Sequence, residues 1–378
     1  MKGLLKIALK LLANDRGKFF TLILGVTFAV FLMNQMTSMF AGIMRKSTSN
    51  VINIGAKMWV MDPSVDNDRS SIPLPDYVLD YVRSIKGVAM AVPIYFGSGL
   101  VKLPDGRYQG ANIIGLDDTT LFGRPPIIKG DLNKIYNSDA FIGVVDSDYR
   151  RIGSPGIGSV LSINDHRAVI VALAKPASGG LFGTPTLYTT YTRATQDLPQ
   201  TRYSMSYILL NPKSNADIPY IQEQVKKLGY KALTQKQFEK TIENFYKYKT
   251  GMGTNIMIMT FISFIVGLSI AGQTFYAFVL ENLEKFGALK AIGAKKYELM
   301  AMILFQASVT SFIGYGFGIM ISSLMIAISK ARIPNYAAIV TYQNMLIAFL
   351  MVVLIAGFSS YIGIRKVLKI EPFDVFRG

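Results

Sequence analysis

The sequence predicts a membrane protein with four transmembrane α-helices, arranged one plus three, and a large mixed α/β extracytoplasmic domain inserted between helices 1 and 2. Two observations predict this fold class. First, 51% of the 378 residues are hydrophobic and the mean hydropathy is +0.33, which is too apolar for an ordinary soluble enzyme. Second, the chain contains four long runs without a charged residue. Because about 20 apolar residues cross the hydrocarbon core, each run is long enough to span it.

The net charge of +16 first suggests a nucleic-acid partner, but the distribution of the charges argues against one. Residues 45–249 hold 25 of the 40 basic residues beside 18 acidic ones, and the other 15 basic residues flank the apolar runs, as orientation signals do. The chain has no cysteine, which excludes disulfides, thiolate metal sites and cysteine nucleophiles. The single histidine, His166, is interpreted as an ordinary turn or strand residue, because a metal site needs several ligands. We therefore expect no metal site and no nucleic-acid partner.

The start of the chain predicts a surface helix followed by a membrane anchor. Residues 1–18 carry five basic residues and a helical stripe of leucines and alanine, which is typical of a cytoplasmic amphipathic helix on the membrane surface. Residues 19–44 contain no charge and predict transmembrane helix 1. A cleaved signal peptide is the alternative, but the run is too long and no small-x-small site follows it before Arg45. We favour an uncleaved anchor.

Residues 45–249 predict the extracytoplasmic α/β domain. The turn signal Leu103-Pro-Asp-Gly106 separates two strand patterns at 88–96 and 108–116, which indicates a hairpin. Near the end, residues 235–249 carry apolar side chains at helical spacing and predict a stalk helix, although a helix packed on its own domain fits the spacing equally well. Further helices are predicted at 75–86 and 216–228, and further strands at 140–145, 160–164, 168–174 and 206–210.

Neither glycine pattern of the chain indicates a nucleotide site. The glycine-rich residues 179–185 lack the Lys-Ser/Thr that completes a phosphate-binding loop, so we interpret them as a flexible loop. Gly314 and Gly318 lie within a predicted span, where a G-x-x-x-G spacing lets helices approach closely. Because the sequence G-x-x-x-x-G-K-[ST] occurs nowhere, ATP would have to bind another chain.

The second half of the chain predicts three more spans, which divide it as follows: transmembrane helix 2 at 250–280, a cytoplasmic segment at 281–298, helix 3 at 299–329, a short extracytoplasmic turn at 330–332, helix 4 at 333–364 and a cytoplasmic tail at 365–378. No Asp, Glu, Lys, Arg or His lies inside a span, which argues against a proton-coupled carrier. The uncharged polar residues of the spans are expected to form hydrogen bonds across helices or to lie near interfaces; they are Asn34, Gln35, Gln273 and Gln306.

The basic residues predict the orientation. With four crossings, both termini and segment 281–298 share one face, and that face has five, four and four basic residues in its three parts against two in the opposite turn. The positive-inside rule makes this face cytoplasmic. Arg45, Lys46, Lys247 and Lys249 point the other way, but they belong to a long domain, where the charge bias counts for less.

Segment 281–298 is the only highly charged stretch between the later spans that is long enough to fold by itself. Its apolar residues recur every three positions and predict a short amphipathic helix that is interrupted or capped at Gly293. From composition alone, a solvated loop is an equal alternative. The apolar positions are Leu283, Phe286, Leu289 and Ile292.

Two strings and the layout resemble a known family. Glu284-Lys-Phe-Gly-Ala-Leu-Lys-Ala-Ile-Gly-Ala294 resembles the stretch after the second membrane helix of ABC-transporter permeases of the MacB/FtsX-like type. Ile370-Glu-Pro-Phe-Asp-Val-Phe-Arg377 is similar to the family's closing pattern, with Pro372 and Arg377 in the matching places. The one-plus-three layout with an insert of about 205 residues also fits, and it looks closest to the DevC-like branch.

The resemblance implies a non-catalytic permease subunit in a bacterial inner membrane, with both termini cytoplasmic. It implies a homodimer, surrounded by membrane lipid, that binds two copies of a separate ABC ATPase; ATP and Mg would be held there, and this chain would hold no cofactor. Further implied partners are a periplasmic adaptor (membrane fusion) protein and an outer-membrane channel. The implied coupling segment has apolar contacts at Phe286, Leu289 and Ile292, polar contacts at Glu284, Lys285 and Lys290, and further members at Glu281, Gly287 and Gly293.

Two functions fit these expectations. The first is mechanotransmission, in which ATP-driven movements of the partner shift the extracytoplasmic domain and export or extract an amphipathic substrate such as a lipid, glycolipid, haem-like molecule or drug. The second is an FtsX-like signalling scaffold that regulates an extracytoplasmic partner, such as a cell-wall hydrolase, without transport. A membrane-anchored enzyme is disfavoured because the sequence has no Ser/His/Asp or metal constellation.

Overall fold

The structure is a computed structural model that divides into two compact units. The helical unit comprises Met1–Gly42 and Gly253–Gly378, and the sheet unit comprises Ile43–Met252. The predicted fold class is confirmed, because four helices among the residues that the structure describes are long and apolar enough to cross a membrane and a mixed α/β region lies between the first and second of them in the chain. The described residues are 2–14, 16–180, 183–197, 205–333 and 336–368.

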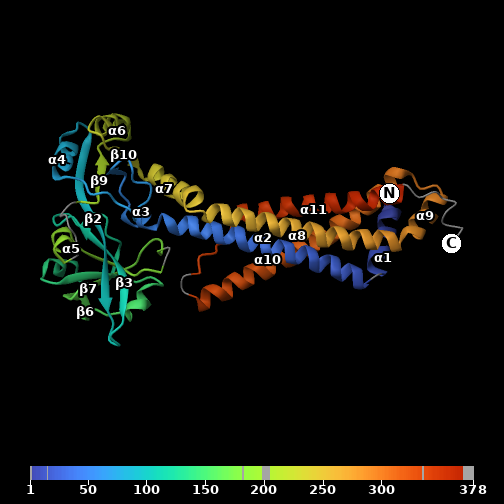
Figure 1. Ribbon diagram of the computed structural model, residues 1–378, viewed down its shortest axis with the longest axis horizontal. Helices are drawn as coiled ribbons and strands as arrows, with labels where there is room; N and C mark the ends of the chain where they lie inside the picture. The colour runs from blue at the N-terminus through green and yellow to red at the C-terminus, as the bar shows by residue number, and fades with distance from the viewer. Residues whose placement is uncertain (1, 15, 181–182, 198–204, 334–335, 369–378) are drawn as a thin grey trace. The chain divides into compact units, whose positions relative to one another are not determined.

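The sheet unit is built on one ten-stranded sheet with the order β10-β1-β9-β2-β3-β8-β5-β7-β4, and β6 pairs with β2 and β7. Figure 1 shows the long β2 running through it. The strands are β1 (Met58–Met61), β2 (Val88–Lys102), β3 (Tyr108–Leu116), β4 (Ile127–Gly130), β5 (Ala140–Val144), β6 (Val160–Ile163), β7 (His166–Ala174), β8 (Thr186–Thr190), β9 (Tyr207–Pro212) and β10 (Lys231–Thr234). The helices are α3 (Ser49–Ile54), α4 (Asp76–Ser84), α5 (Tyr191–Asp197), α6 (Ile218–Lys227) and α7 (Gln235–Asn244), with short helical turns η1 (Leu132–Tyr136), η2 (Tyr149–Ile152), η3 (Asn215–Asp217) and η4 (Phe245–Lys249).

Alternation along β1 separates two cores of the sheet unit. Met58 and Val60 belong to the cluster covered by α4 and α6, whereas Trp59 and Met61 belong to the cluster that contains Phe238 of α7. Successive side chains of a strand point to opposite faces, so one short strand serves both cores. Because all four residues of β1 are buried, its sequence does not alternate between apolar and polar residues. The strand could therefore not be predicted from such a pattern.

The predicted hairpin is confirmed, with one extension. Gly106 N–H donates to the Leu103 carbonyl at 2.9 Å, and Gly106 has the positive φ of 84° that suits a glycine. The first strand continues to Lys102, beyond the predicted end at residue 96, because its second half pairs with β3. His166 begins β7 and is exposed.

The predicted stalk helix at 235–249 is divided in the structure. The α-helix α7 ends at Asn244, and η4 continues as a π-helix in which Thr250 N–H donates to the Phe245 carbonyl at 3.2 Å. Gly251 then adopts φ 73°, so the chain leaves the helical conformation before α8 begins at Met252. Single π-helical turns are rare and frequently functional.

The helical unit has six helices among its described residues (Figure 1). α10 approaches α2 closely at Gly314 and Gly318: a Cβ at these positions would lie 2.7 Å from the Val26 Cβ and 2.6 Å from the Val30 Cβ. Small residues allow such contact between helices in lipid. The helices are α1 (Lys2–Asn14), α2 (Arg16–Ser47), α8 (Met252–Glu281), α9 (Leu283–Ala291), α10 (Lys296–Arg332) and α11 (Tyr342–Leu368).

Two predicted boundaries in this unit are wrong. Residues 330–332 are the last residues of α10 rather than a turn, and the helix predicted from residue 333 begins at Tyr342. Ile333 is extended, with φ −112° and ψ 103°, because the proline that follows disfavours the helical conformation at the preceding residue. The extended segment 336–341 packs on α2, where Ile339 N–H donates to the Ser38 carbonyl at 2.8 Å.

Three of the four uncharged polar residues form hydrogen bonds to other segments, as predicted. The Asn34 amide donates to the Ser322 hydroxyl at 2.6 Å, Gln35 donates to Tyr336, and Gln306 donates to the Ala8 carbonyl of α1 at 2.8 Å. Gln273 differs, because its side chain is exposed on α8 and has no hydrogen bond within the described parts of the chain.

Candidate coupling site

Segment 281–298 begins at Glu281, the last residue of α8, and the buried Asn282 follows directly before α9. The Asn282 side chain donates to the Phe278 carbonyl at 2.9 Å and accepts a hydrogen bond from Lys285 Nζ at 2.8 Å. Its backbone carbonyl accepts from Phe286 N–H at 3.1 Å. Asn282 therefore satisfies backbone groups at the break between two helices. Sequence reasoning missed it, although an asparagine three residues before a lysine in a charged segment was the available signal.

The segment turns sharply at Gly293, after α9. Gly293 N–H donates to the Lys290 carbonyl at 3.1 Å, and Ala294 N–H donates to the Leu289 carbonyl at 3.0 Å. This pair of hydrogen bonds defines a Schellman motif, whose C′ residue is usually a glycine because it needs a positive φ. Gly293 has φ 106°. Lys295 N–H then donates to Glu298 Oε2 at 2.8 Å and starts α10.

The inner face of α9 packs on the chain's own bundle. Phe286 is fully buried, in one cluster with Phe278, Leu299 and Val367, and Leu289 packs against that cluster. Gly287 is also buried. The family resemblance implied Phe286, Leu289 and Ile292 as apolar contacts for a partner, but Phe286 is fully buried and has no surface to offer one. Its burial instead holds α9 against α8, α10 and α11.

Two polar contacts tie the segment to other helices. Lys290 Nζ donates to the Leu368 carbonyl at 3.4 Å, at the end of α11, where a cation also complements the helix dipole. Glu281 forms an ion pair with Lys18 of α2. Sequence reasoning missed this pair, because residues 263 positions apart in the chain leave no local signal.

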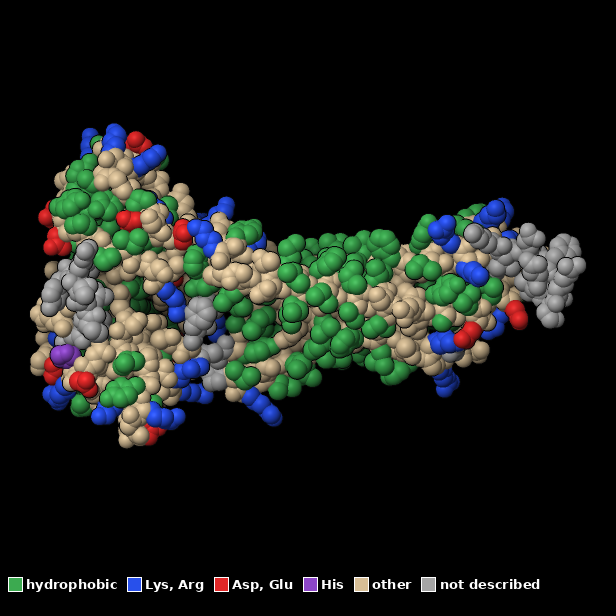
Figure 2. Space-filling model, in the orientation of Figure 1, with side chains coloured by type: hydrophobic (Ala, Val, Ile, Leu, Met, Phe, Trp, Pro, Cys, Tyr) green, Lys and Arg blue, Asp and Glu red, His purple; other side chains and the backbone are tan. Residues whose placement is uncertain are grey.

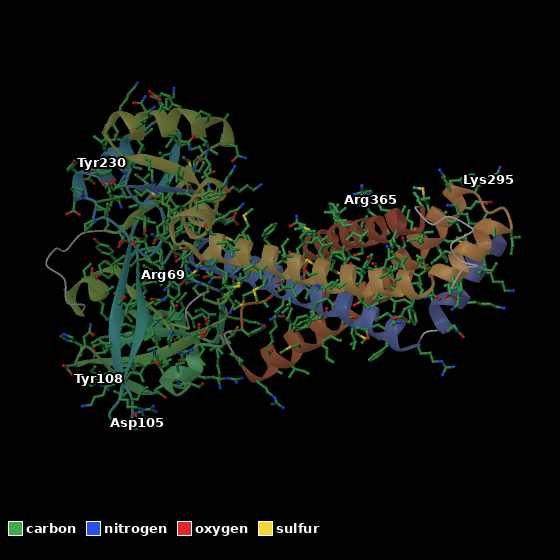
Figure 3. The ribbon with its side chains drawn as sticks, turned by 45° about the vertical axis from the view of Figure 1, so that its right-hand side comes forward. Arg69, Asp105, Tyr108, Tyr230, Lys295 and Arg365 are labelled. Carbon is green, nitrogen blue, oxygen red and sulfur yellow. The ribbon has the colours of Figure 1, made fainter. Side chains whose placement is uncertain are left out.

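The outer face of the segment combines one prominent apolar side chain with charges. Ile292 is 85% exposed and Tyr297 is 56% exposed, and both flank the turn that contains Lys295. Figure 3 shows Lys295 at the end of the helical unit. The remaining exposed charged residues of the segment are Glu281, Glu284, Lys285 and Lys296.

The charges of the helical unit gather at its ends. In Figure 2 the middle of this unit is covered by hydrophobic side chains, and Lys and Arg side chains cluster around α9. The described parts of the chain hold no group of three or more His, Cys, Asp or Glu residues that could bind a metal. The exposed part of the segment thus combines an apolar centre with a charged rim, a composition that is typical of protein interfaces. The second string of the sequence analysis, with Pro372 and Arg377, lies outside the described residues.

Comparisons with known proteins agree with this layout. The family model described as MacB-like periplasmic core domain matches residues 19–228, and the one described as FtsX-like permease C-terminal matches residues 256–372. The chain is 22% identical over 390 residues to the macrolide export ATP-binding/permease protein MacB of Bradyrhizobium diazoefficiens, covering 97% of this chain and 59% of that protein. It is 27% identical over 166 residues to a Staphylococcus haemolyticus protein described as a hemin transport system permease, HrtB, covering 44% of this chain and 45% of that protein.

The chain thus spans about half the length of these curated relatives. Among solved structures, the periplasmic region of MacB from Actinobacillus actinomycetemcomitans is 13% identical, with a TM-score of 0.39, covering 50% of this chain and 95% of that chain. This TM-score is too low to add to the sequence matches.

Proposed function

Because the chain belongs to the MacB-like and FtsX-like family of ABC-transporter permeases, we propose that it is the membrane subunit of an ATP-driven transporter whose ATPase is a separate chain. Two copies of that ATPase would bind ATP and Mg and would dock on the outer face of segment 281–298. The observation that carries the proposal is the division of this segment: Phe286 is buried in the bundle, whereas Ile292 is 85% exposed.

Ile292 is the central contact of the proposed docking surface. A single exposed isoleucine is common on proteins, but this one lies at a rigidly capped turn with Tyr297 beside it and charged residues around it. Interfaces typically bury an apolar or aromatic centre inside a charged rim. Glu284 and Lys285, which are exposed, would belong to that rim.

The contacts of the segment support force transmission rather than a substrate channel at this point. A displacement of segment 281–298 acts on α11 through Lys290 of α9, on α2 through Glu281 at the end of α8, and on α10 through the Schellman motif. Packed elements move as rigid bodies because cores resist continuous deformation. We propose mechanotransmission on this basis.

The orientation proposed here puts both termini and segment 281–298 in the cytoplasm of a bacterium, with the sheet unit outside. The helical unit's basic residues support this arrangement, since Lys285, Lys290, Lys295 and Lys296 lie in the segment, whereas Lys330 and Arg332 lie at the end of α10. An adaptor protein and an outer-membrane channel would then meet the sheet unit.

A homodimer is proposed from a ridge on α8. Ile262 and Ile265 are exposed, and Ser269 and Gln273 continue the same stripe with exposed polar side chains. An amide that faces hydrocarbon without a partner is costly, and interhelical hydrogen bonds relieve that cost. The α8 ridge, defined as Ile258, Ile262, Ile265, Ser269 and Gln273, would pack on the same ridge of a second copy.

The substrate proposed is an amphipathic molecule that is exported or extracted from the membrane. Relatives are described for hemin and for macrolide transport, and both ligands combine a large apolar body with polar groups. No Asp, Glu, Lys, Arg or His lies within the apolar centres of the spans, so the energy is proposed to come from the ATPase.

The test is co-purification of a separate ABC ATPase with this chain from its native membrane. Ile292→Asp should lower its recovery at least about tenfold, because a charge at the centre of an apolar contact is desolvated without a partner. Ile128→Asp is the matched control, since Ile128 is 56% exposed in the sheet unit. Equal recovery with both variants would exclude the proposed docking surface. Recovery of a cell-wall hydrolase with the wild-type chain, together with no transport in vesicles, would instead support the signalling scaffold.

A further inference from the structure

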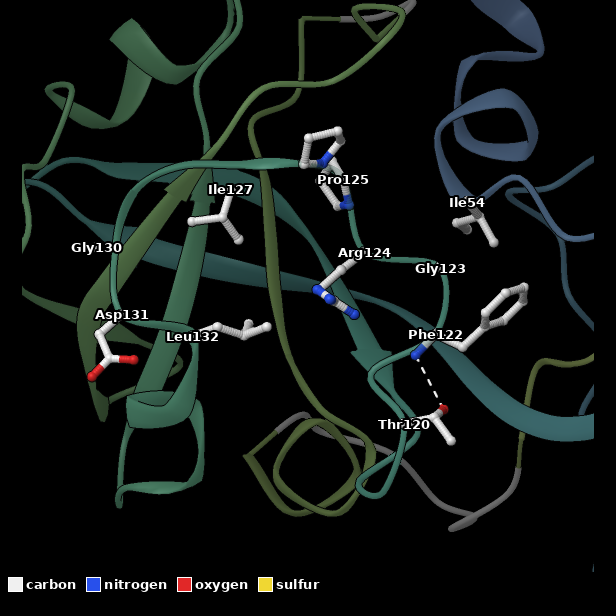
Figure 4. Close-up of a pocket in the computed structure, with 11 residues that line it drawn as sticks. Ile54, Thr120, Phe122, Gly123, Arg124, Pro125, Ile127, Gly130, Asp131 and Leu132 are labelled. Carbon is white, nitrogen blue, oxygen red and sulfur yellow. Dashed lines mark hydrogen bonds between the residues drawn. The ribbon is translucent and has the colours of Figure 1, made fainter.

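The sheet unit contains a cavity of 730 Å³ beside the segment that joins β3 to β4. Ligand pockets for small molecules occupy roughly 300–1,000 Å³ and are mostly apolar with a few placed polar groups. Figure 4 shows Ile54 and Phe122 on one side and Ile127 and Leu132 on the other. Pro125 and Pro126 add to the apolar lining.

The backbone around the cavity is held in place before any ligand arrives. Gly123 has φ 91°, and a Cβ there would lie 2.9 Å from Cγ2 of Ile54, so α3 packs closely on this segment. Gly130 has φ 103° and approaches the Val171 carbonyl and Ala172 of β7. The Pro126 carbonyl accepts a hydrogen bond from Lys175 N–H at 3.0 Å. These contacts preorganise the two apolar sides, which reduces the entropic cost of binding.

Two charged side chains line the cavity, and only one is positioned for a ligand. Asp131 caps η1, where its Oδ1 accepts a hydrogen bond from Asn133 N–H at 2.9 Å, and it points away from the apolar walls in Figure 4. Arg124 lies between the walls, and its Nη1 donates to the Leu121 carbonyl at 3.3 Å. A guanidinium has five N–H donors, and this hydrogen bond to Leu121 uses one of them, so other donors of Arg124 are left for a ligand.

We propose that this cavity binds an amphipathic anion, with its apolar body between the two walls and its carboxylate, sulfonate or phosphate on Arg124. The inference rests on the proposed function, because it adds a negative charge to the amphipathic substrate class. Arginine binds such oxyanions in a bidentate geometry, which selects charged head groups over neutral ones. A neutral ligand of the same shape would not form this bidentate interaction with the guanidinium of Arg124.

The test uses the full chain in lipid nanodiscs and a fatty acid that carries a photoactivatable diazirine, with its methyl ester as the neutral counterpart. After irradiation, labelled peptides are mapped by mass spectrometry, so probe dissolved in the bilayer is distinguished by where it labels. The acid should label the peptide that contains residues 120–132, and the ester should label it about tenfold less, which is the scale of one charge-assisted hydrogen bond.

Variants separate Arg124 from general electrostatics. Arg124→Gln should reduce labelling of this peptide by the acid about tenfold, and Arg124→Lys should keep part of it. Lys129→Gln is the matched control, because Lys129 is exposed, carries the same charge and does not line the cavity. It should label like the wild type.

Three results would overturn the proposal: equal labelling by acid and ester, labelling confined to the long helices, or equal losses in Arg124→Gln and Lys129→Gln. The readout does not depend on ATP or on the ATPase. If Ile292→Asp lost the ATPase but its cavity were labelled like that of the wild type, both proposals would be supported by independent results. Because the two readouts are separate, a failure of the docking surface and a failure of the binding cavity can be distinguished.

Discussion

α2 and α8 are the most and the least enclosed of the four long apolar helices. In the most apolar stretch of each helix, 44% of α2 and 22% of α8 is buried. Each helix carries an amide in its span: Asn34 of α2 is fully buried and bonded to Ser322, whereas Gln273 of α8 is exposed. The Asn34 amide thus forms a contact inside the bundle, whereas the Gln273 amide forms no hydrogen bond within the described residues. The difference identifies α2 as the structural centre of the helical unit and α8 as its exposed helix, on which we have proposed that a second copy packs.

The largest effect is expected where α10 meets α2. Gly318→Leu would place a side chain against Val30 and the Thr27 carbonyl, and overpacking of this kind costs about 1–3 kcal/mol or more. We expect a lower thermal unfolding midpoint in detergent and a lower yield. Gly316→Leu is the matched control, because a Cβ at Gly316 meets nothing within 4 Å. If the two variants unfolded at the same temperature, α2 would not be the centre on which α10 packs.

A smaller effect is expected from Asn34→Leu. The substitution removes the hydrogen bond to Ser322 and should destabilise the protomer by about 1 kcal/mol, as interhelical hydrogen bonds do in membranes. Gln273→Leu should leave the unfolding midpoint of a single copy unchanged, because the Gln273 side chain is exposed on α8 rather than buried in the bundle. Thermal unfolding of both variants measures the contrast directly, and an equal loss would erase the distinction between the two helices.

The α8 ridge can be probed by disulfide cross-linking, because the natural chain has no cysteine. Gln273→Cys and Ser269→Cys should form dimers in native membranes under mild oxidation. Leu350→Cys, on α11 and 55% exposed, is the control and should stay monomeric. If only Leu350→Cys formed dimers, the interface would lie on α11 rather than on the α8 ridge.

The smallest effect is expected from a buried carboxyl in the sheet unit, Asp68. Asp68 is 2% exposed, and burial raises its pKa above the usual value, although the Asn50 amide donates to it at 2.7 Å. The folded state then holds the proton of Asp68 more tightly than the unfolded state does. The free energy of unfolding therefore decreases as the pH rises from about 3.9, the ordinary aspartate pKa, to the higher pKa of the folded state. Asp68→Asn should flatten this slope. The free energy of unfolding of both proteins is measured between acidic and neutral pH. If Asp68→Asn kept the slope of the wild type, the buried carboxyl would not be the cause of the pH dependence.

The candidate site was predictable in part. The charged segment between two spans located it, and Gly293 marked its turn through the known preference of a Schellman motif. The sequence could not separate Phe286 from Ile292, because apolar residues at a spacing of three all satisfy the same pattern. Only the packing of α8, α10 and α11 around α9 buries one and exposes the other.

The sequence by itself determined the four spans and the polar domain between the first two, because hydrocarbon demands long uncharged helices and no other pattern provides them. The tertiary structure decided what local pattern leaves open. It packed segment 336–341 on α2, paired Lys18 with Glu281, and placed Arg124 between two apolar walls. Each of these features depends on residues that are far apart in the chain, and a hydropathy pattern does not relate such residues to one another.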